Sequence, residues 1–149
     1  MSFSLDVSEF AQLIDKRALY VQRGVAIDLF SKVVIRTPVD TAALRANWRP
    51  SVNKPNKSKT RKLDKDGQET IKLIQNKFAK ARGDAFILSN NLVYAPIVEY
   101  GLYPSKGGGE TAKTINGYSK QAPKGMVRVT LAEFLAAIRK KAREAKGIT

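Results

Sequence analysis

The chain has 149 residues, and 27 Lys and Arg against 13 Asp and Glu give it a formal net charge of +14. It contains no cysteine and no histidine, which excludes disulfides, Cys/His zinc sites, Ser-His and Cys-His nucleophilic centres and histidine acid–base catalysis. So large a positive surplus indicates an acidic partner: nucleic acid, an anionic lipid surface or an acidic protein face.

The length and the 43% hydrophobic content predict one folded domain over residues 1–149. The first residues lack a basic stretch followed by a long apolar run, and no run approaches the roughly 20 apolar residues that span a bilayer. We therefore expect an aqueous, cytoplasmic setting, no membrane partner and no cofactor.

An amphipathic helix is expected from about Val7 to Arg36, because Asp6 and Glu9 have capping-box spacing at its start. Thr37-Pro38 ends it, since a proline disfavours helix in the residue before it. Gly24 inside it indicates a bend or a close helix crossing. The apolar residues that recur at helical spacing are Phe10, Leu13, Ile14, Ala18, Val21, Val25, Leu29, Phe30 and Val33.

A strand is predicted from Leu44 to Val52, entered through a turn that Asp40 or Thr41 can cap. Alternation would place Leu44, Ala46 and Trp48 on one face. Aromatic side chains bury large areas, so the single Trp is expected to be a core anchor.

Residues 53–63 form a basic loop with almost no apolar residue. It can be merely solvated or it can contact phosphates, and composition favours neither. Its lack of aromatic residues indicates backbone contacts rather than base stacking if it meets nucleic acid. The DNA-facing candidates are Lys54, Lys57, Lys59, Arg61 and Lys62.

A second helix is expected from about Asp66 to Arg82, with Asp66 and Glu69 again at capping-box spacing. The apolar run at 85–88 reads as a buried strand that can pair with the strand at 44–52. The Asn90-Asn91 pair favours a turn out of that strand.

The stretch from Tyr94 to Gly101 holds a short helix over 95–99, with Pro96 suited to its start and Gly101 to its stop. Glu99 could be catalytic, but no second carboxylate, histidine or cysteine is near it in sequence. An ion-pair or capping role at a packed corner is therefore favoured.

A glycine-rich loop follows at 102–121, in which Asn116-Gly117 is a hairpin signal. Residues 126–129 are extended in character. Thr130 and Glu133 then begin a closing helix, whose basic last turns complement the helix dipole. The predicted fold is α+β, with long N-terminal, middle and C-terminal helices packed on a small, mainly antiparallel sheet.

Three stretches in this order resemble the tail-completion or neck protein family of long-tailed bacteriophages, across nearly the whole chain. They are Thr37-Pro-Val-Asp-Thr-Ala-Ala-Leu-Arg45 with Asn47-Trp48, Ser89-Asn-Asn-Leu-Val-Tyr-Ala95 with Val98-Glu-Tyr-Gly101, and Ala122-Pro-Lys-Gly-Met-Val127. One departure is Ala42, where the family usually carries glycine after Asp-Thr; the turn must then avoid a positive φ or accept strain.

The resemblance implies a virion protein of the head–tail junction, made in the host cytoplasm. It would assemble as a ring, a hexamer in expectation, that joins the tail tube to the head connector without enzymatic activity. A ring needs two different patches on each subunit, for which the long first helix is a candidate. The other interface candidates are Tyr94, Glu99, Tyr100, Tyr103 and Met126, and the surplus Lys and Arg could face DNA in the channel.

The alternative function is a small basic nucleic-acid-binding module in which the basic loop is the working part. A carboxylate-metal enzyme built on Asp64, Asp66 and Glu69 is disfavoured, because those acids are better explained by the start of a helix.

Overall fold

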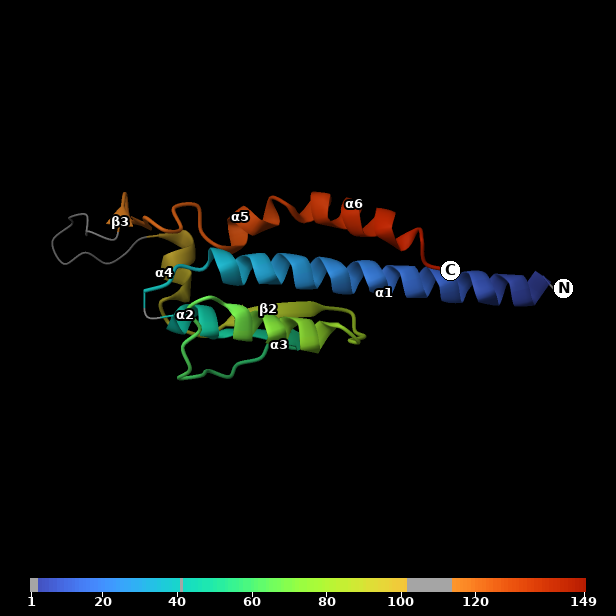
Figure 1. Cartoon of the computed structure of the whole chain (residues 1–149), viewed down its shortest axis with the longest axis horizontal. Coiled ribbons are helices and arrows are strands. Elements are labelled where there is room, and N and C mark those ends of the chain that lie inside the picture. Colours follow the sequence, from blue (N-terminus) through green and yellow to red (C-terminus); the bar gives the residue numbers. More distant parts are fainter. Residues whose placement is uncertain (1–2, 41, 102–113) are drawn as a thin grey trace.

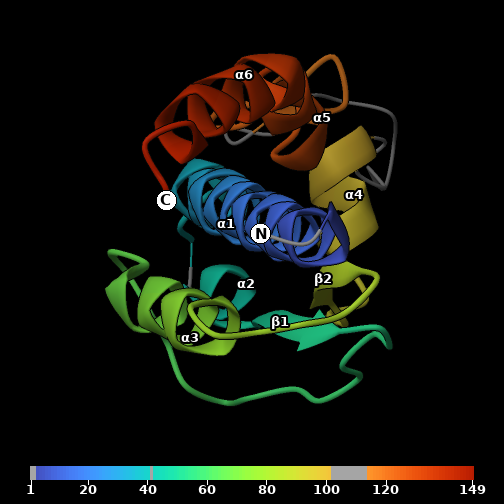
Figure 2. The ribbon, with the colours of Figure 1, turned by 90° about the vertical axis from the view of Figure 1, so that its right-hand side faces the viewer.

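The computed structural model describes residues 3–40, 42–101 and 114–149, with side chains described from Val7 onward. Helix α1 (Phe3–Arg36) is a central rod (Figures 1 and 2). Helices α5 (Val127–Leu131) and α6 (Phe134–Ala145) cover one side of it, and α3 (Gln68–Phe78) lies on the other with strands β1 (Trp48–Val52) and β2 (Phe86–Asn90). The predicted α+β class is confirmed.

The short elements lie mostly at the end of α1 that carries its C-terminus (Figure 1). They are α2 (Ala43–Ala46), α4 (Ala95–Tyr100), β3 (Thr114–Ile115) and β4 (Tyr118–Ser119). The hairpin of β3 and β4 confirms the Asn116-Gly117 signal, since both turn residues have positive φ, 51° and 77°. Among the described residues, no helix is both long and apolar enough to cross a bilayer.

Strands β1 and β2 pair antiparallel, from Trp48 opposite Asn90 to Val52 opposite Phe86. This confirms the predicted pairing on either side of the middle helix. The Asn90 side chain makes the expected turn, because its Oδ1 accepts the backbone N–H of Leu92 at 3.2 Å.

The main core lies where α1, α3 and the sheet meet. Trp48 is buried, as predicted, and its Nε1–H donates to the hydroxyl of Thr37 at 2.8 Å. That hydroxyl itself donates to the carbonyl of Val33 at 2.7 Å, so the residue that ends α1 also orients the Trp. The buried apolar members are Ala26, Val33, Val34, Leu44, Trp48, Ile74, Phe78, Ala95, Val98, Ala122 and Met126.

A second cluster joins α6 to α1, where Val25 and Leu29 pack against Ala137. A Cβ on Gly24 would lie 2.7 Å from the Lys141 side chain. Gly24 therefore marks a close approach of α6 to α1, one of the two predicted meanings.

The predicted strand from Leu44 is wrong in its first half, because residues 43–46 form α2 and the strand begins at Trp48. Ala42, Leu44 and Ala46 are all buried in the packed turn. The alternation of apolar residues here therefore does not mark one face of a strand. Ala42 has φ of +64°, a left-handed conformation that costs a non-glycine residue about 1–2 kcal/mol. The departure at Ala42 is thus accommodated with strain.

The prediction of extended chain at 126–129 is also wrong, because α5 begins at Val127. Thr130 lies inside α5, where its hydroxyl donates to the carbonyl of Met126 at 2.7 Å, and it does not cap a helix. The closing helix α6 begins at Phe134.

Other boundaries shift by a few residues: α1 begins at Phe3 and not near Val7, and α3 ends at Phe78 and not near Arg82. The start of α3 is held mainly by Asp64, whose carboxylate accepts the backbone N–H groups of Gly67 and Thr70, both at 2.9 Å. In place of the capping box predicted for Asp66 and Glu69, the Asp66 side chain accepts one hydrogen bond, from the backbone N–H of Gln68.

Candidate interaction surfaces

Glu99 holds the corner between α4 and α5. Its carboxylate accepts the backbone N–H groups of Met126, Val127 and Arg128 at 2.6, 2.8 and 2.9 Å, and the Arg128 Nε–H at 3.1 Å. Burial alone would raise the pKa of this carboxyl, but the backbone donors together with the Arg128 side chain outweigh it and lower the pKa below the usual value. The predicted capping and ion-pair role of Glu99 is confirmed.

The five interface candidates separate by exposure. Glu99 and Met126 are 6% and 0% exposed, so their side chains contact residues of their own chain. Tyr94 and Tyr100 are exposed, and the Arg128 guanidinium carbon lies 5.2 Å from the centroid of the Tyr100 ring. Tyr103 lies outside the described residues.

The basic loop is fixed to the sheet through alternate residues. The Asn47 side chain accepts the Thr60 N–H at 2.8 Å and donates to the Thr60 carbonyl at 3.1 Å. The Asn56 carbonyl accepts hydrogen bonds from Ser89 Oγ and Asn91 Nδ2, both at 2.8 Å. These contacts give the loop backbone a defined path.

Between and beyond the fixed residues, the basic side chains point outward. Lys57, Lys59 and Arg61 are exposed and alternate with Asn56, Ser58 and Thr60. We call the exposed set the cationic ridge; its full membership is Lys54, Lys57, Lys59, Arg61 and Lys62. An ordered row of charges of this kind can contact phosphates without losing loop entropy on binding.

An apolar groove with a volume of about 640 Å³ runs along α1. Its floor comes from α1, one wall from α5 and α6, and the other from Phe86 of β2. Leu131 and Phe134 lie on the α5–α6 wall, and their side chains are exposed to solvent. The lining residues are Ala18, Val21, Gln22, Val25, Ala26, Leu29, Phe30, Val33, Phe86, Val127, Thr130, Leu131, Phe134 and Ile138.

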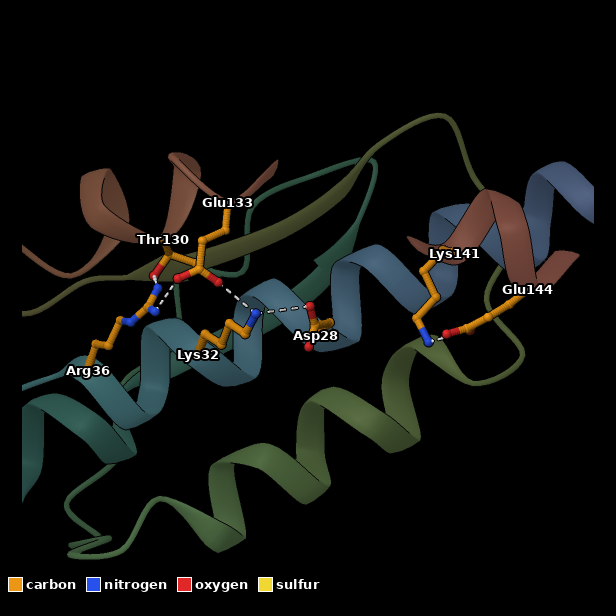
Figure 3. Close-up of polar contacts among 7 residues, drawn as sticks. All are labelled: Asp28, Lys32, Arg36, Thr130, Glu133, Lys141 and Glu144. Carbon is orange, nitrogen blue, oxygen red and sulfur yellow. Dashed lines mark hydrogen bonds and ion pairs between the residues drawn. The ribbon is translucent and has the colours of Figure 1, made fainter. Parts of the chain in front are cut away.

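Polar contacts fix the α5–α6 wall on α1 (Figure 3). The Glu133 carboxylate forms ion pairs with Lys32, at 2.7 Å, and with Arg36. The Arg36 guanidinium also donates a hydrogen bond to the Thr130 hydroxyl at 3.0 Å. The hydrogen bond from Lys32, and to a smaller extent the one from Arg36, lowers the pKa of Glu133 below its usual value. At the other end, the Tyr20 hydroxyl of α1 donates to the Glu144 carboxylate at 2.9 Å. Glu144 also pairs with Lys141 of its own helix at 2.8 Å.

Asp64 is buried and committed to the start of α3, and burial, which would raise its pKa, is outweighed by the Thr70 and Gly67 donors that lower it. No group of three or more acidic residues among the described ones could hold a metal ion.

Sequence reasoning missed the groove, although a signal was present. The apolar residues of α1 cover a broader arc than one stripe needs, because Ala26, Phe30 and Val33 extend it beyond Val25 and Leu29.

Comparisons with models of protein families, with curated proteins and with solved structures give no match for this chain.

Proposed function

We propose that this chain is a structural protein of the phage head–tail junction, a neck, tail-completion or tail-terminator component. It assembles as a ring around the DNA channel, with six copies as the expected number, and joins the tail tube to the head connector. The resemblance to the tail-completion family motivates this proposal. The observation that carries it is that the three stretches with this resemblance lie together in the fold.

These stretches are far apart in sequence but meet in one corner of the fold. The Asn90 side chain donates to the Leu44 carbonyl at 2.8 Å, which joins the first stretch to the second. Glu99 then caps Met126 and its neighbours, which joins the second to the third. Residues that carry the family pattern therefore stabilise one another, as expected if the pattern encodes this fold.

The charge of the surface supports a position beside DNA. The cationic ridge presents five basic side chains from a fixed backbone, and none of the ion pairs found among the described residues involves them. A ring that surrounds a genome needs contact with phosphates that does not depend on sequence.

The test is the oligomeric state of the purified chain. Mass photometry should find particles at a multiple of the 16.5 kDa chain mass, six-fold in expectation, and electron microscopy should show closed rings. The polypeptide should also be present in finished phage particles. A chain that stays monomeric at all concentrations, or that is absent from particles, would overturn the proposal.

The cationic ridge also favours a second candidate, a small basic nucleic-acid-binding module. In that case a monomer should bind DNA at physiological salt, and ring formation should not be needed. Measuring DNA binding and particle mass on the same sample separates the two functions.

A further inference from the structure

The N-terminal end of α1 presents an apolar stripe to solvent. Val7, Phe10 and Ile14 are 49, 64 and 47% exposed, and their i, i+3, i+7 spacing places them on one helix face. Figure 1 shows this end of α1 extending past the other elements of the fold. A projecting helix with such anchors has the form that recognition of a groove by a helix requires.

The groove along α1 matches this segment in size and chemistry. Its floor runs from Ala18 to Val33, about 22 Å at 1.5 Å per residue, whereas the helix from Phe3 to Ile14 is about 17 Å long. The side chains around the groove are almost all apolar, and the exposed Leu131 and Phe134 add apolar surface at its wall.

Charge also favours a contact between copies. Residues 1–15 contain Asp6, Glu9 and Asp15 and no Lys or Arg. The remaining chain holds all 27 basic residues against 10 acidic ones. The projecting end is therefore acidic and the body that would receive it is strongly basic, a complementarity that steers association.

We propose that the N-terminal end of α1 in one copy lies in the α1–α5–α6 groove of the next copy. This inference rests on the proposed ring and names its subunit contact. The contact is head-to-tail, because the helix end and the groove are different surfaces, and such contacts close into rings when the rotation between copies permits.

The groove cannot be filled by the helix end of its own chain. Both belong to the same continuous helix, from Phe3 to Arg36, and the groove floor begins at Ala18 on that helix. Folding back would require α1 to break between Ile14 and Ala18. This excludes an intramolecular occupant, and the match in size and charge favours the helix end of a second copy.

Two variants separate the surfaces. Phe10→Glu with Ile14→Glu disables the helix end, and Leu131→Glu with Phe134→Glu disables the groove wall. All four side chains are exposed in the single chain, so the fold should tolerate the changes. The matched control is Leu63→Glu with Leu73→Glu, which alters two exposed leucines outside both surfaces.

Mass photometry should find the control assembled like the unchanged chain. Each disabled variant alone should need at least about a tenfold higher concentration to assemble, as expected from the loss of one buried Phe-sized contact. An equimolar mixture of the two variants retains one intact helix end and one intact groove. It should form heterodimers that do not grow further.

Assembly of either variant at the concentration of the unchanged chain would overturn this inference while leaving the ring intact. A mixture that stays monomeric would also overturn it, because the intact helix end of one variant and the intact groove of the other would then fail to bind each other. If the unchanged chain itself never assembles, the proposed function fails first, so the two failures are distinguishable.

A second measurement locates the contact directly. The chain has no cysteine, so Ala11→Cys gives one site for a benzophenone photocrosslinker on the exposed helix end. Crosslinks to the groove-lining residues of another copy are expected. Crosslinks between two helix ends, or to the cationic ridge, would refute the assignment.

Discussion

The carboxylate of Glu99 accepts the backbone N–H of Met126 at 2.6 Å, across 27 positions of sequence. The next two N–H groups, of Val127 and Arg128, bind the same carboxylate. The first turn of α5 therefore receives its cap from a residue on α4, and not from a neighbour in sequence.

Replacing Glu99 with Gln should destabilise the fold by about 2–3 kcal/mol, because charge-assisted hydrogen bonds to buried donors are lost. Gln keeps the shape but not the charge. Urea unfolding followed by circular dichroism measures the free energy, with Glu9→Gln, an exposed residue of α1, as the control. A loss equal to that of the control would refute the capping role.

Acid should destabilise the protein through the same group. Glu99 and Asp64 both have folded-state pKa values below their usual ones of 4.5 and 3.8. Their stabilisation is therefore fully present above about pH 5 and is lost as pH falls through the folded-state values. Unfolding curves from pH 7 to pH 2 should show this fall. The Glu99→Gln variant should show a shallower fall, and an identical slope would contradict the prediction.

Gly125→Ala should cost at least about 2 kcal/mol. Gly125 has φ of +76°, which strains any side-chain-bearing residue, and a Cβ there would lie 2.5 Å from Glu99 Oε1. Gly147→Ala is the control, because the nearest atom to its Cβ is 3.6 Å away, and it should change the unfolding free energy by less than about 0.5 kcal/mol. Equal effects of the two changes would count against this account of the corner.

If the cationic ridge contacts DNA, changing its five basic residues to Gln should lower the slope of log affinity against log salt by about 0.9 for each phosphate contact removed. Titrations at several salt concentrations measure the slope. A control with the same charge change, made on exposed residues elsewhere, should lower it less. The ridge set is Lys54, Lys57, Lys59, Arg61 and Lys62, and the control set is Lys72, Lys77, Lys80, Arg139 and Lys140. Equal slopes for the two sets would remove the ridge from the DNA contact.

Features set by local chemistry were predictable from sequence. The end of α1 at Arg36 follows from Thr37-Pro38, and the hairpin at 114–119 follows from Asn116-Gly117. The role of Glu99 was predictable in kind, because an isolated acid without partners for catalysis is usually structural.

The errors occur where distant residues override local preference. Val127 and Val129 favour extended chain, but the cap from Glu99 makes residues 127–131 helical. Burial does alternate from Ala42 to Ala46, but these residues are buried by the packed turn around α2 and not on one face of a strand. The groove arises from the relative placement of α1, α5, α6 and β2, which no local pattern specifies.

The α5–α6 wall is held at both ends, by Glu133 with Lys32 and Arg36 at one and by the Arg17 guanidinium on the Ile148 carbonyl at the other. The close approach at Gly24 fixes it between them. Because the groove is already formed in the single chain, binding needs no opening step. The association of two copies should then be limited by their mutual orientation, with rate constants of about 10⁵–10⁷ M⁻¹s⁻¹. The speed of assembly would then rise with protein concentration and fall as salt screens the attraction between the acidic helix end and the basic body.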